Sequence, residues 1–533
     1  MKAGMAAPPS EQYYRHFQCR WLSNSTDRNP PAMPLTSHHL LSRRLLYAVC
    51  LLLLGAACVA AAHAQGPSLA ARVVPLGPPF ASETAARVAE SGSWLLRGRS
   101  LLGLFMFAAV AYGVGQVRRR GQKTPLRLVL WGFGIQFMFA FLVLDTAPGK
   151  HGFAYASAAI RNLLDFSQQG GKFVFGDLAL GNNIPVGLPL GDPQMGPILQ
   201  PTAYAHVGGY FAFYVLPTIV FFCALTALFY YSGVMQKIIQ GIAWVMQRSM
   251  GTSGAETLAA ATNIFVGQTE APLMVKPFLA KATNSELMAI MTAGFANIAS
   301  GVLAAYAAML SGFFPDAAGH LLAASLLSAP SSLVVAKLIF PETKTPETAG
   351  TVKITVDRTD VNAIDALTRG ALEGLTLALN VGAVLIVFIA MIALLNAIIG
   401  WAGHFFGYPT LSFQQILGWI ATPFAWLTGM PWHDAKQVGP LLGIKTAVNE
   451  FVAYLQMSQA LSANPHFITP RSAVLTIYAL CGFANFSSVA IQVGGISGMA
   501  PHRRSDLSRL GLLAMFGGAL SSLMAACVVG VLL

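Results

Sequence analysis

The chain has 533 residues and a mean hydropathy of +0.59, and 55% of its residues are hydrophobic while only 10% are charged. Soluble domains carry roughly 25% charged residues, so this composition excludes an ordinary water-soluble protein and indicates a membrane protein. The formal net charge of +12 does not indicate nucleic-acid binding, because the Lys and Arg residues lie between apolar runs and do not gather on one solvated face.

The N-terminal region matches the pattern of a signal peptide with a long extension. Two arginines precede an apolar run at 45–61, and the small-x-small motif at 62–64 resembles a cleavage site. We expect residues 1–64 to form an extended n-region and a cleaved signal peptide, with Met33 as the true start, followed by a polar periplasmic segment at 65–97. An uncleaved first transmembrane helix is the alternative interpretation of the same run.

Apolar segments that can span a bilayer, which takes about 20 residues, follow along the rest of the chain. We count eight, at 98–117, 128–144, 207–231, 284–311, 317–340, 371–401, 471–494 and 510–533. Two further stretches, 251–282 and 411–462, are apolar but interrupted by Gly, Pro and charged residues, so neither is a plain crossing. The pattern predicts an all-α polytopic membrane protein.

Basic residues predict the orientation, because positively charged loops stay cytoplasmic. They crowd the connections at 118–127 and 502–509, which a periplasmic start places on the same side of the membrane. The segment 153–166 has apolar residues at helical spacing and is either an interfacial helix or an ordinary packed loop helix. We divide the chain into N-terminal scaffold helices with this interfacial segment (98–206), a first half (207–340), a cytoplasmic linker (341–370) and a second half (371–533).

A seven-residue motif occurs twice. GFANIAS at 294–300 recurs as GFANFSS at 482–488, with five identities in register, and each copy lies inside a predicted span. Each also follows an interrupted segment that carries one glutamate, Glu270 or Glu450. The orientation places one interrupted segment on each side of the membrane, so we expect an inverted repeat of a hairpin and a broken helix, as in many secondary transporters. Close helix packing by small residues is the alternative explanation.

The two glutamates are functional candidates, because a carboxylate at bilayer depth costs several kcal/mol unless it is paired or solvated. Gln268, Thr269 and Glu270 offer amide, hydroxyl and carboxylate groups that suit a flat polar ligand such as a base. On the other side, Glu450 with Asn485 and Ser488 would suit the hydroxyls of a sugar, and Phe483 could stack on the ligand. Lys276 and Lys445 could instead form structural ion pairs with the glutamates, although Lys276 fits a cytoplasmic anchor better.

The stretch 443–454, GIKTAVNEFVAY, matches the signature (G/A)-x-K-x-x-x-N-E-F-V-A-(Y/M/F) and resembles the concentrative nucleoside transporters. The segment 267–273 is similar to the first hairpin of that family, and 481–501 is similar to its broken seventh helix and the following loop. The resemblance covers roughly 98–533. It implies eight transmembrane helices with two opposed re-entrant hairpins, a homotrimer, and a transport domain that moves past a scaffold like an elevator.

The resemblance also implies ligands. Its implied partners are a nucleoside and the lipid bilayer of the inner membrane, with a coupling ion, no other cofactor, no nucleic acid and no enzymatic activity. The residues implied to face the base are Gln268, Thr269, Glu270 and Val302, those for the ribose are Glu450, Asn485 and Ser488, and Phe483 lines the site. The implied sodium site comprises Asn263, the Val266 carbonyl, Asn297 and the Ile298 carbonyl. Asn297 stands where sodium-driven members are expected to carry a hydroxyl, so Na⁺ is favoured with H⁺ as the alternative.

Two other classes of function are open to the same sequence. An intramembrane enzyme could use the two carboxylates, but the sequence lacks H-E-x-x-H and G-x-S-x-G motifs. A transporter or channel for another small polar solute could share the opposed hairpins, although two acidic residues argue against an anionic substrate.

Overall fold

The computed structural model describes residues 94–119, 125–180, 184–190, 198–205, 211–349, 360–408 and 411–533. The expected signal region 1–64, including Met33, lies outside the described residues, as do most of the segment 65–97 and part of the linker, 350–359.

The chain begins its described part with three helices, α4 (Trp94–Arg119), α5 (Leu126–Leu144) and α6 (Ala147–Phe175). The hydroxyl of Thr146 caps α6 by accepting a hydrogen bond from the Gly149 amide, and α6 ends at Gly176, whose φ is 60°. Helix α6 contains the segment 153–166, so the prediction of a helix there is confirmed.

A short 3₁₀ helix, η2 (Gly176–Leu180), leads into two antiparallel strands, β1 (Ile184–Leu190) and β2 (Ile198–Ala205). The prediction of an all-α chain is therefore wrong for this connection, although it holds for the membrane part. The sequence of β1, IPVGLPL, explains the difference, because two prolines and a glycine oppose a helix.

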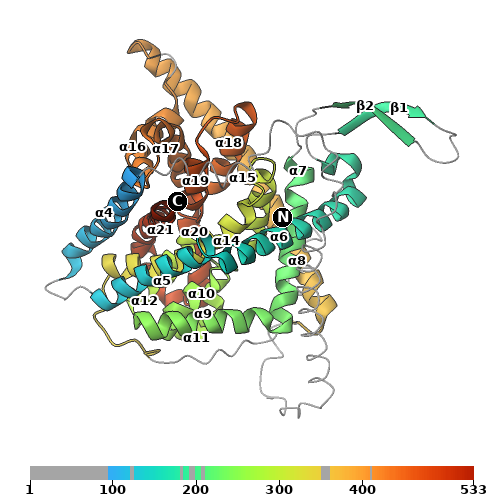
Figure 1. Cartoon of the computed structure of the whole chain (residues 1–533). Helices are drawn as coiled ribbons and strands as arrows, with labels where there is room; N and C mark the ends of the chain where they lie inside the picture. The colour runs from blue at the N-terminus through green and yellow to red at the C-terminus, as the bar shows by residue number, and fades with distance from the viewer. Residues whose placement is uncertain are drawn as a thin grey trace, which may run out of the picture. The chain divides into compact units, whose positions relative to one another are not determined.

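The two halves of the remaining chain follow a similar order of helices, which Figure 1 labels. The first half comprises α7 (Phe211–Tyr214), α8 (Leu216–Ser232), α9 (Val234–Met250), α10 (Gly254–Thr262), η3 (Ala271–Val275), α11 (Lys276–Leu279), α12 (Asn284–Ala296), α13 (Ser300–Leu310) and α14 (Ala317–Ile339). The second comprises α15 (Ala363–Phe405), α16 (Phe413–Leu427), α17 (Trp432–Ala447), α18 (Glu450–Ala463), α19 (Pro470–Leu480), α20 (Phe486–Met499), η4 (Pro501–Arg503) and α21 (Arg504–Leu532). Each half thus runs from two consecutive helices, α8 and α9 or α15 and α16, through a hairpin to a broken helix and a closing helix.

Among the residues that the structure describes, seven helices are long and apolar enough to cross a membrane. They correspond to seven of the eight predicted segments. The other predicted segment, 471–494, is divided into α19 and α20, and the predicted segment 284–311 is divided into α12 and α13. The interrupted stretches 251–282 and 411–462 are both broken into short helices, as their Gly and Pro residues indicate.

The broken helices lie in the core. Helix α12 packs against α14 and α21, and α19 packs against α21. In the most apolar stretches of α12–α13 and of α14, 89% of the residues are buried. In the corresponding stretch of α15 only 11% are buried, and this helix packs mainly along α8. Helices α4 and α5 pack on α14 and α21. Burial therefore separates a core built around α12, α14 and α21 from the less buried helices α4, α5, α8 and α15.

Candidate functional site

The two copies of the repeated motif meet where their helices break. The Phe483 amide donates a hydrogen bond to the Asn297 carbonyl at 3.3 Å. Gly482 has a φ of +124°, and a Cβ at this position would lie 2.7 Å from the Phe295 carbonyl oxygen. A helix broken inside a membrane leaves backbone groups without partners, and here one break satisfies a carbonyl of the other. The close approach requires a glycine at position 482.

Asn485 links the second break to the second hairpin. Its Oδ1 accepts hydrogen bonds from the Ser488 amide at 2.8 Å and from the Ser487 hydroxyl at 2.7 Å, so it caps α20. Its Nδ2 donates to Glu450 Oε2 at 3.1 Å. The contact that the sequence suggested between Glu450 and Asn485 is therefore present. Both ends of the Asn485 amide are used, which neither aspartate nor leucine could reproduce.

Glu450 is a buried carboxylate at the start of α18, and only 4% of its surface is exposed. Tyr306 donates its hydroxyl to Glu450 Oε1 at 2.8 Å and stacks on Tyr454 with ring centroids 4.4 Å apart. The N-terminal end of α18 also favours a negative charge. Sequence reasoning missed Tyr306. The available signal was its position one helical turn after Val302, which is buried on α13.

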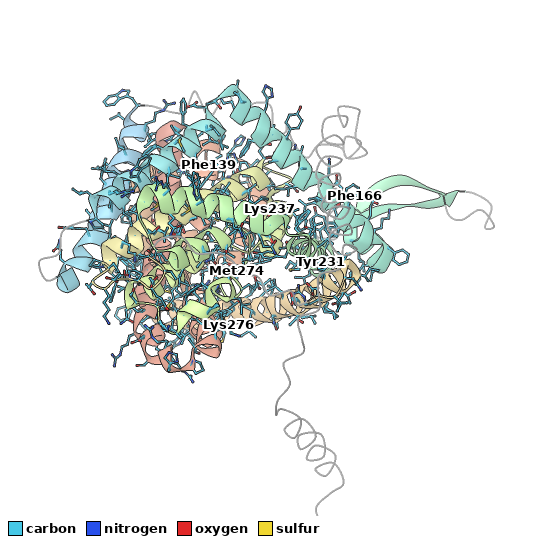
Figure 2. The ribbon with its side chains drawn as sticks, turned by 90° about the horizontal axis from the view of Figure 1, so that it is seen from below. Phe139, Phe166, Tyr231, Lys237, Met274 and Lys276 are labelled. Carbon is cyan, nitrogen blue, oxygen red and sulfur yellow. The ribbon has the colours of Figure 1, made fainter. Side chains whose placement is uncertain are left out.

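Lys445 caps the end of α19. Its Nζ donates to the Ala479 carbonyl at 2.8 Å and to the Ser522 hydroxyl at 3.1 Å. The Ala479 carbonyl lies at the C-terminal end of α19, where a positive charge is favourable, and the Ser522 hydroxyl is a neutral oxygen of α21. The proposed ion pair between Lys445 and a glutamate is therefore not its role in this structure. Lys276 has an exposed side chain, as expected for an anchor (Figure 2).

The tip of the first hairpin lies against α20. Gln268 is buried, and its Oε1 accepts a hydrogen bond from Gln492 Nε2 at 3.0 Å. Thr269 is half-buried, and a Cβ added to Gly495 of α20 would lie 3.0 Å from Thr269 Cγ2. Glu270 is exposed, and its Oε2 accepts from the Gly267 amide at 2.8 Å. The hairpin thus presents its polar tip beside the second broken helix.

The remaining candidates for the substrate site lie at the two helix breaks, some at the first and some at the second. Phe483 is half-buried at the second break, beside Asn485, and Ser488 is buried in the first turn of α20. Val302 is placed with Tyr306 on α13, which connects it to the Glu450 side. Gln492, like Tyr306, is a polar residue that sequence reasoning missed, although it lies one turn after Ser488 on the same face of α20.

Two buried asparagines could hold a small cation. Asn263 Nδ2 donates to the Ala259 carbonyl at 3.0 Å, and Asn297 Nδ2 donates to the Ala293 carbonyl at 3.2 Å. Both Oδ1 atoms are buried and have no hydrogen-bond partner. An unsatisfied buried acceptor costs about 1–3 kcal/mol, which a bound cation would remove. Amide and carbonyl oxygens are the ligands of hard cations such as Na⁺.

The Ser300 amide donates to the Phe265 carbonyl at 3.2 Å, which brings the segment after α10 against the first break. This contact joins the neighbourhood of Asn263 and Val266 to that of Asn297 and Ile298. None of the backbone amides in the described ranges donates to the Val266 or Ile298 carbonyl. The four predicted cation ligands therefore lie on two connected segments, and within the described residues the two Oδ1 atoms have no hydrogen-bond partner and the two carbonyls accept from no backbone amide.

A buried charged cluster lies at the end of the first hairpin that is opposite to its tip. Lys337 Nζ lies 2.6 Å from Glu256 Oε2, and both side chains are buried. Ser253 and Thr348 donate their hydroxyls to Glu286, at 2.6 and 3.1 Å. A buried ion pair needs such further hydrogen bonds to offset its desolvation. The cluster fixes the beginnings of α10 and α12 to the end of α14 and to the first residues of the linker.

Three family models match the chain. They are described as the Na⁺ dependent nucleoside transporter N-terminus (residues 102–178), a nucleoside recognition Gate domain (212–313) and the Na⁺ dependent nucleoside transporter C-terminus (320–530). An uncharacterized transporter of Haemophilus influenzae is 41% identical over 81% of this chain and 96% of its own length. Sodium/nucleoside cotransporter 1 of Mus musculus is 40% identical over 81% of this chain and 63% of its own length, so the chain spans less than two thirds of this animal relative. The structure of CNTnw in an inward-facing substrate-bound state matches with 39% identity and a TM-score of 0.71, over 82% of this chain and 97% of that one.

Proposed function

Because the chain belongs to the family of Na⁺-dependent nucleoside transporters, which are membrane transporters and not enzymes, we propose that it imports nucleosides together with a cation. The observation that carries the proposal is the buried Glu450 carboxylate at the meeting point of the two breaks, with Tyr306 and Asn485 as its donors. Each carboxylate oxygen has a second acceptor site, so Glu450 can also accept hydrogen bonds from two ribose hydroxyls.

The substrate site of the proposal has two parts. Glu450, Asn485 and Ser488 bind the ribose, and Phe483 packs against the ligand. The base faces the tip of the first hairpin, with its amide, hydroxyl and carboxylate groups, and the side chain of Val302. The residues for the base are Gln268, Thr269, Glu270 and Val302. The contacts of Glu450 and of Gln268 with the second broken helix support this arrangement.

We further propose sodium as the coupling ion, held by the Asn263 and Asn297 side chains and by the Val266 and Ile298 carbonyls. The two orphaned Oδ1 atoms support this assignment. The cation would stabilise the segment between α10 and η3 that carries Gln268, so substrate and sodium should bind cooperatively. Proton coupling is the alternative, and uptake driven by a pH gradient in sodium-free buffer would establish it.

Transport would follow an elevator motion of the core past α8 and α15, in a homotrimer within the inner membrane. The topology of the proposal has eight transmembrane helices, counting α19 and α20 together, and two opposed re-entrant hairpins that make an inverted repeat. The packing of α4 and α5 on α14 and α21 favours their movement with the core. The scaffold is therefore better assigned to α8 and α15 than to the first helices of the segment 98–206.

Uptake of labelled uridine by proteoliposomes tests the function. Accumulation of uridine against its own gradient that requires an inward sodium gradient supports the proposal. Uridine flux that only follows the uridine gradient, and that does not change with any ion gradient, would indicate a channel instead. A panel of competing nucleosides, measured with sodium and with a pH gradient separately, then defines the preference for purines or pyrimidines and the coupling ion.

A further inference from the structure

A pair of buried glutamine side chains connects the two halves of the chain beside the proposed base site. Gln268 comes from the tip of the first hairpin and Gln492 from α20, and their side chains are 7% and 0% exposed. Gln492 Nε2 donates to Gln268 Oε1 at 3.0 Å.

The backbone fixes the orientation of the Gln492 amide. Gln492 Nε2 also donates to the Met291 carbonyl of α12, at 3.2 Å. A backbone carbonyl can only accept, so the opposite orientation would place two acceptor oxygens against each other at that position. The orientation holds even though it leaves Gln492 Oε1 buried without a partner. Both N–H bonds of Gln492 are therefore committed, one to α12 and one to the first hairpin.

The orientation of Gln492 in turn fixes that of Gln268. Because a donor faces Gln268 from α20, the oxygen of the Gln268 amide must point toward α20. Its nitrogen is the end that remains for a ligand. Gln268 therefore turns its two N–H donors away from α20, while its oxygen, which already accepts from Gln492, keeps one further lone pair.

Building on the proposed function, we propose that Gln492 is a positioning residue that holds Gln268 as a hydrogen-bond donor toward the nucleobase. The hairpin tip then recognises a base through an acceptor atom, which is a carbonyl oxygen or an unprotonated ring nitrogen. When it is ionised, the Glu270 carboxylate can only accept hydrogen bonds, so the tip then presents one donor side chain and one acceptor side chain.

Gly294 makes the space for this pair. A Cβ at position 294 would lie 2.3 Å from Gln492 Nε2 and 3.1 Å from Gln268 Cβ. The glycine of the second motif, Gly482, has a different role, because its backbone has a positive φ. The first glycine of the repeat therefore serves the glutamine pair, and Gly294→Ala should disturb the pair by a direct clash while both glutamines stay in the sequence.

The first test needs no variant. Competition with labelled uridine compares two pairs of unlabelled nucleosides. The first is uridine and 4-thiouridine, whose sulfur is a weaker acceptor than the 4-carbonyl oxygen while the N3–H is kept, and the second is cytidine and 3-deazacytidine, which lacks the ring nitrogen acceptor. We expect the loss or weakening of one acceptor to weaken binding about 3- to 10-fold in at least one of these pairs, the range of a neutral hydrogen bond. Equal affinities within both pairs would overturn the donor assignment. If wild-type protein takes up no nucleoside at all, the proposed function fails and not this inference alone.

The second test asks whether Gln492 acts through Gln268. In Gln492→Met the Gln268 amide can turn, so the discrimination within the affected pair should fall below about twofold, and adding Gln268→Ala should cause no further loss. The uridine to 2′-deoxyuridine ratio and the sodium requirement should stay unchanged.

Gln136→Met is the matched control, because Gln136 is also a fully buried glutamine that donates to a backbone carbonyl, Gly132, but it lies in α5. Discrimination that survives in Gln492→Met, or additive losses in the double variant, would contradict the positioning role. If Gln492→Met does not fold, Gly294→Ala supplies the same comparison.

Discussion

Replacement of Glu450 by glutamine tests the ribose site most directly. The substitution keeps the shape of the side chain but puts an amide NH₂ where one carboxylate oxygen stands, so only one acceptor remains for Tyr306, Asn485 and the ribose together. Hydrogen bonds to a charged group contribute about 1.5–3 kcal/mol, so their loss should weaken uridine binding about 10- to 150-fold. Folding should survive, because the Tyr306 hydroxyl can turn and accept from the new amide.

The assay is uridine binding by purified Glu450→Gln protein, together with its melting temperature and its uptake in proteoliposomes. Tyr306→Phe is the matched control, since it removes one donor at 2.8 Å and leaves the charge of Glu450 in place. Its affinity for uridine should fall less than that of Glu450→Gln. A Glu450→Gln protein that melts like wild type and binds uridine as tightly would refute the role of the carboxylate in ribose binding.

The remaining predictions concern the ion, the buried lysine and the N-terminus. Asn263→Ala should raise the sodium concentration for half-maximal uptake with little effect at saturating sodium, whereas sodium-independent uptake that an uncoupler abolishes would exclude the sodium site. Lys445→Met should lower the melting temperature more than Lys276→Met, because only Lys445 is buried among carbonyls of a helix end; equal melting temperatures would contradict this. Deletion of residues 1–32 should leave membrane insertion unchanged, and a mature protein that begins upstream of Leu45 in N-terminal sequencing would contradict signal cleavage.

Hydropathy predicts the long helices well, because the requirement to satisfy backbone groups in lipid leaves few alternatives. The predicted segment 317–340 corresponds to α14, Ala317–Ile339. The predicted segment 371–401 is shorter than α15, Ala363–Phe405, because the first turns of α15 carry Asp365 and Arg369 and extend the helix beyond its apolar part. The β1–β2 hairpin was not predicted, since its strands pair across a connection whose geometry no local pattern reveals.

The sequence predicted those parts of the site whose residues lie in a short recognisable motif. The signature around Glu450 and the repeated GFAN motif predicted that Glu450 and Asn485 lie together, and the structure places them 3.1 Å apart. Tyr306 and Gln492 were not predicted, because their importance depends on contacts with residues 144 and 224 positions away. A tyrosine or glutamine in an apolar helix has many possible explanations until packing shows what it contacts.

The hydrogen bond between the Phe483 amide and the Asn297 carbonyl has a consequence for biosynthesis. A ribosome adds roughly 5–20 residues per second, so the first broken helix exists for about 10–40 s before the backbone that completes it has been made. During this interval the Asn297 carbonyl must bond to water, to lipid headgroups or to the insertion machinery. The first half should therefore stay near the translocation channel or the membrane surface until the second half emerges, and a truncated chain that ends in the linker should be a ready substrate for membrane proteases.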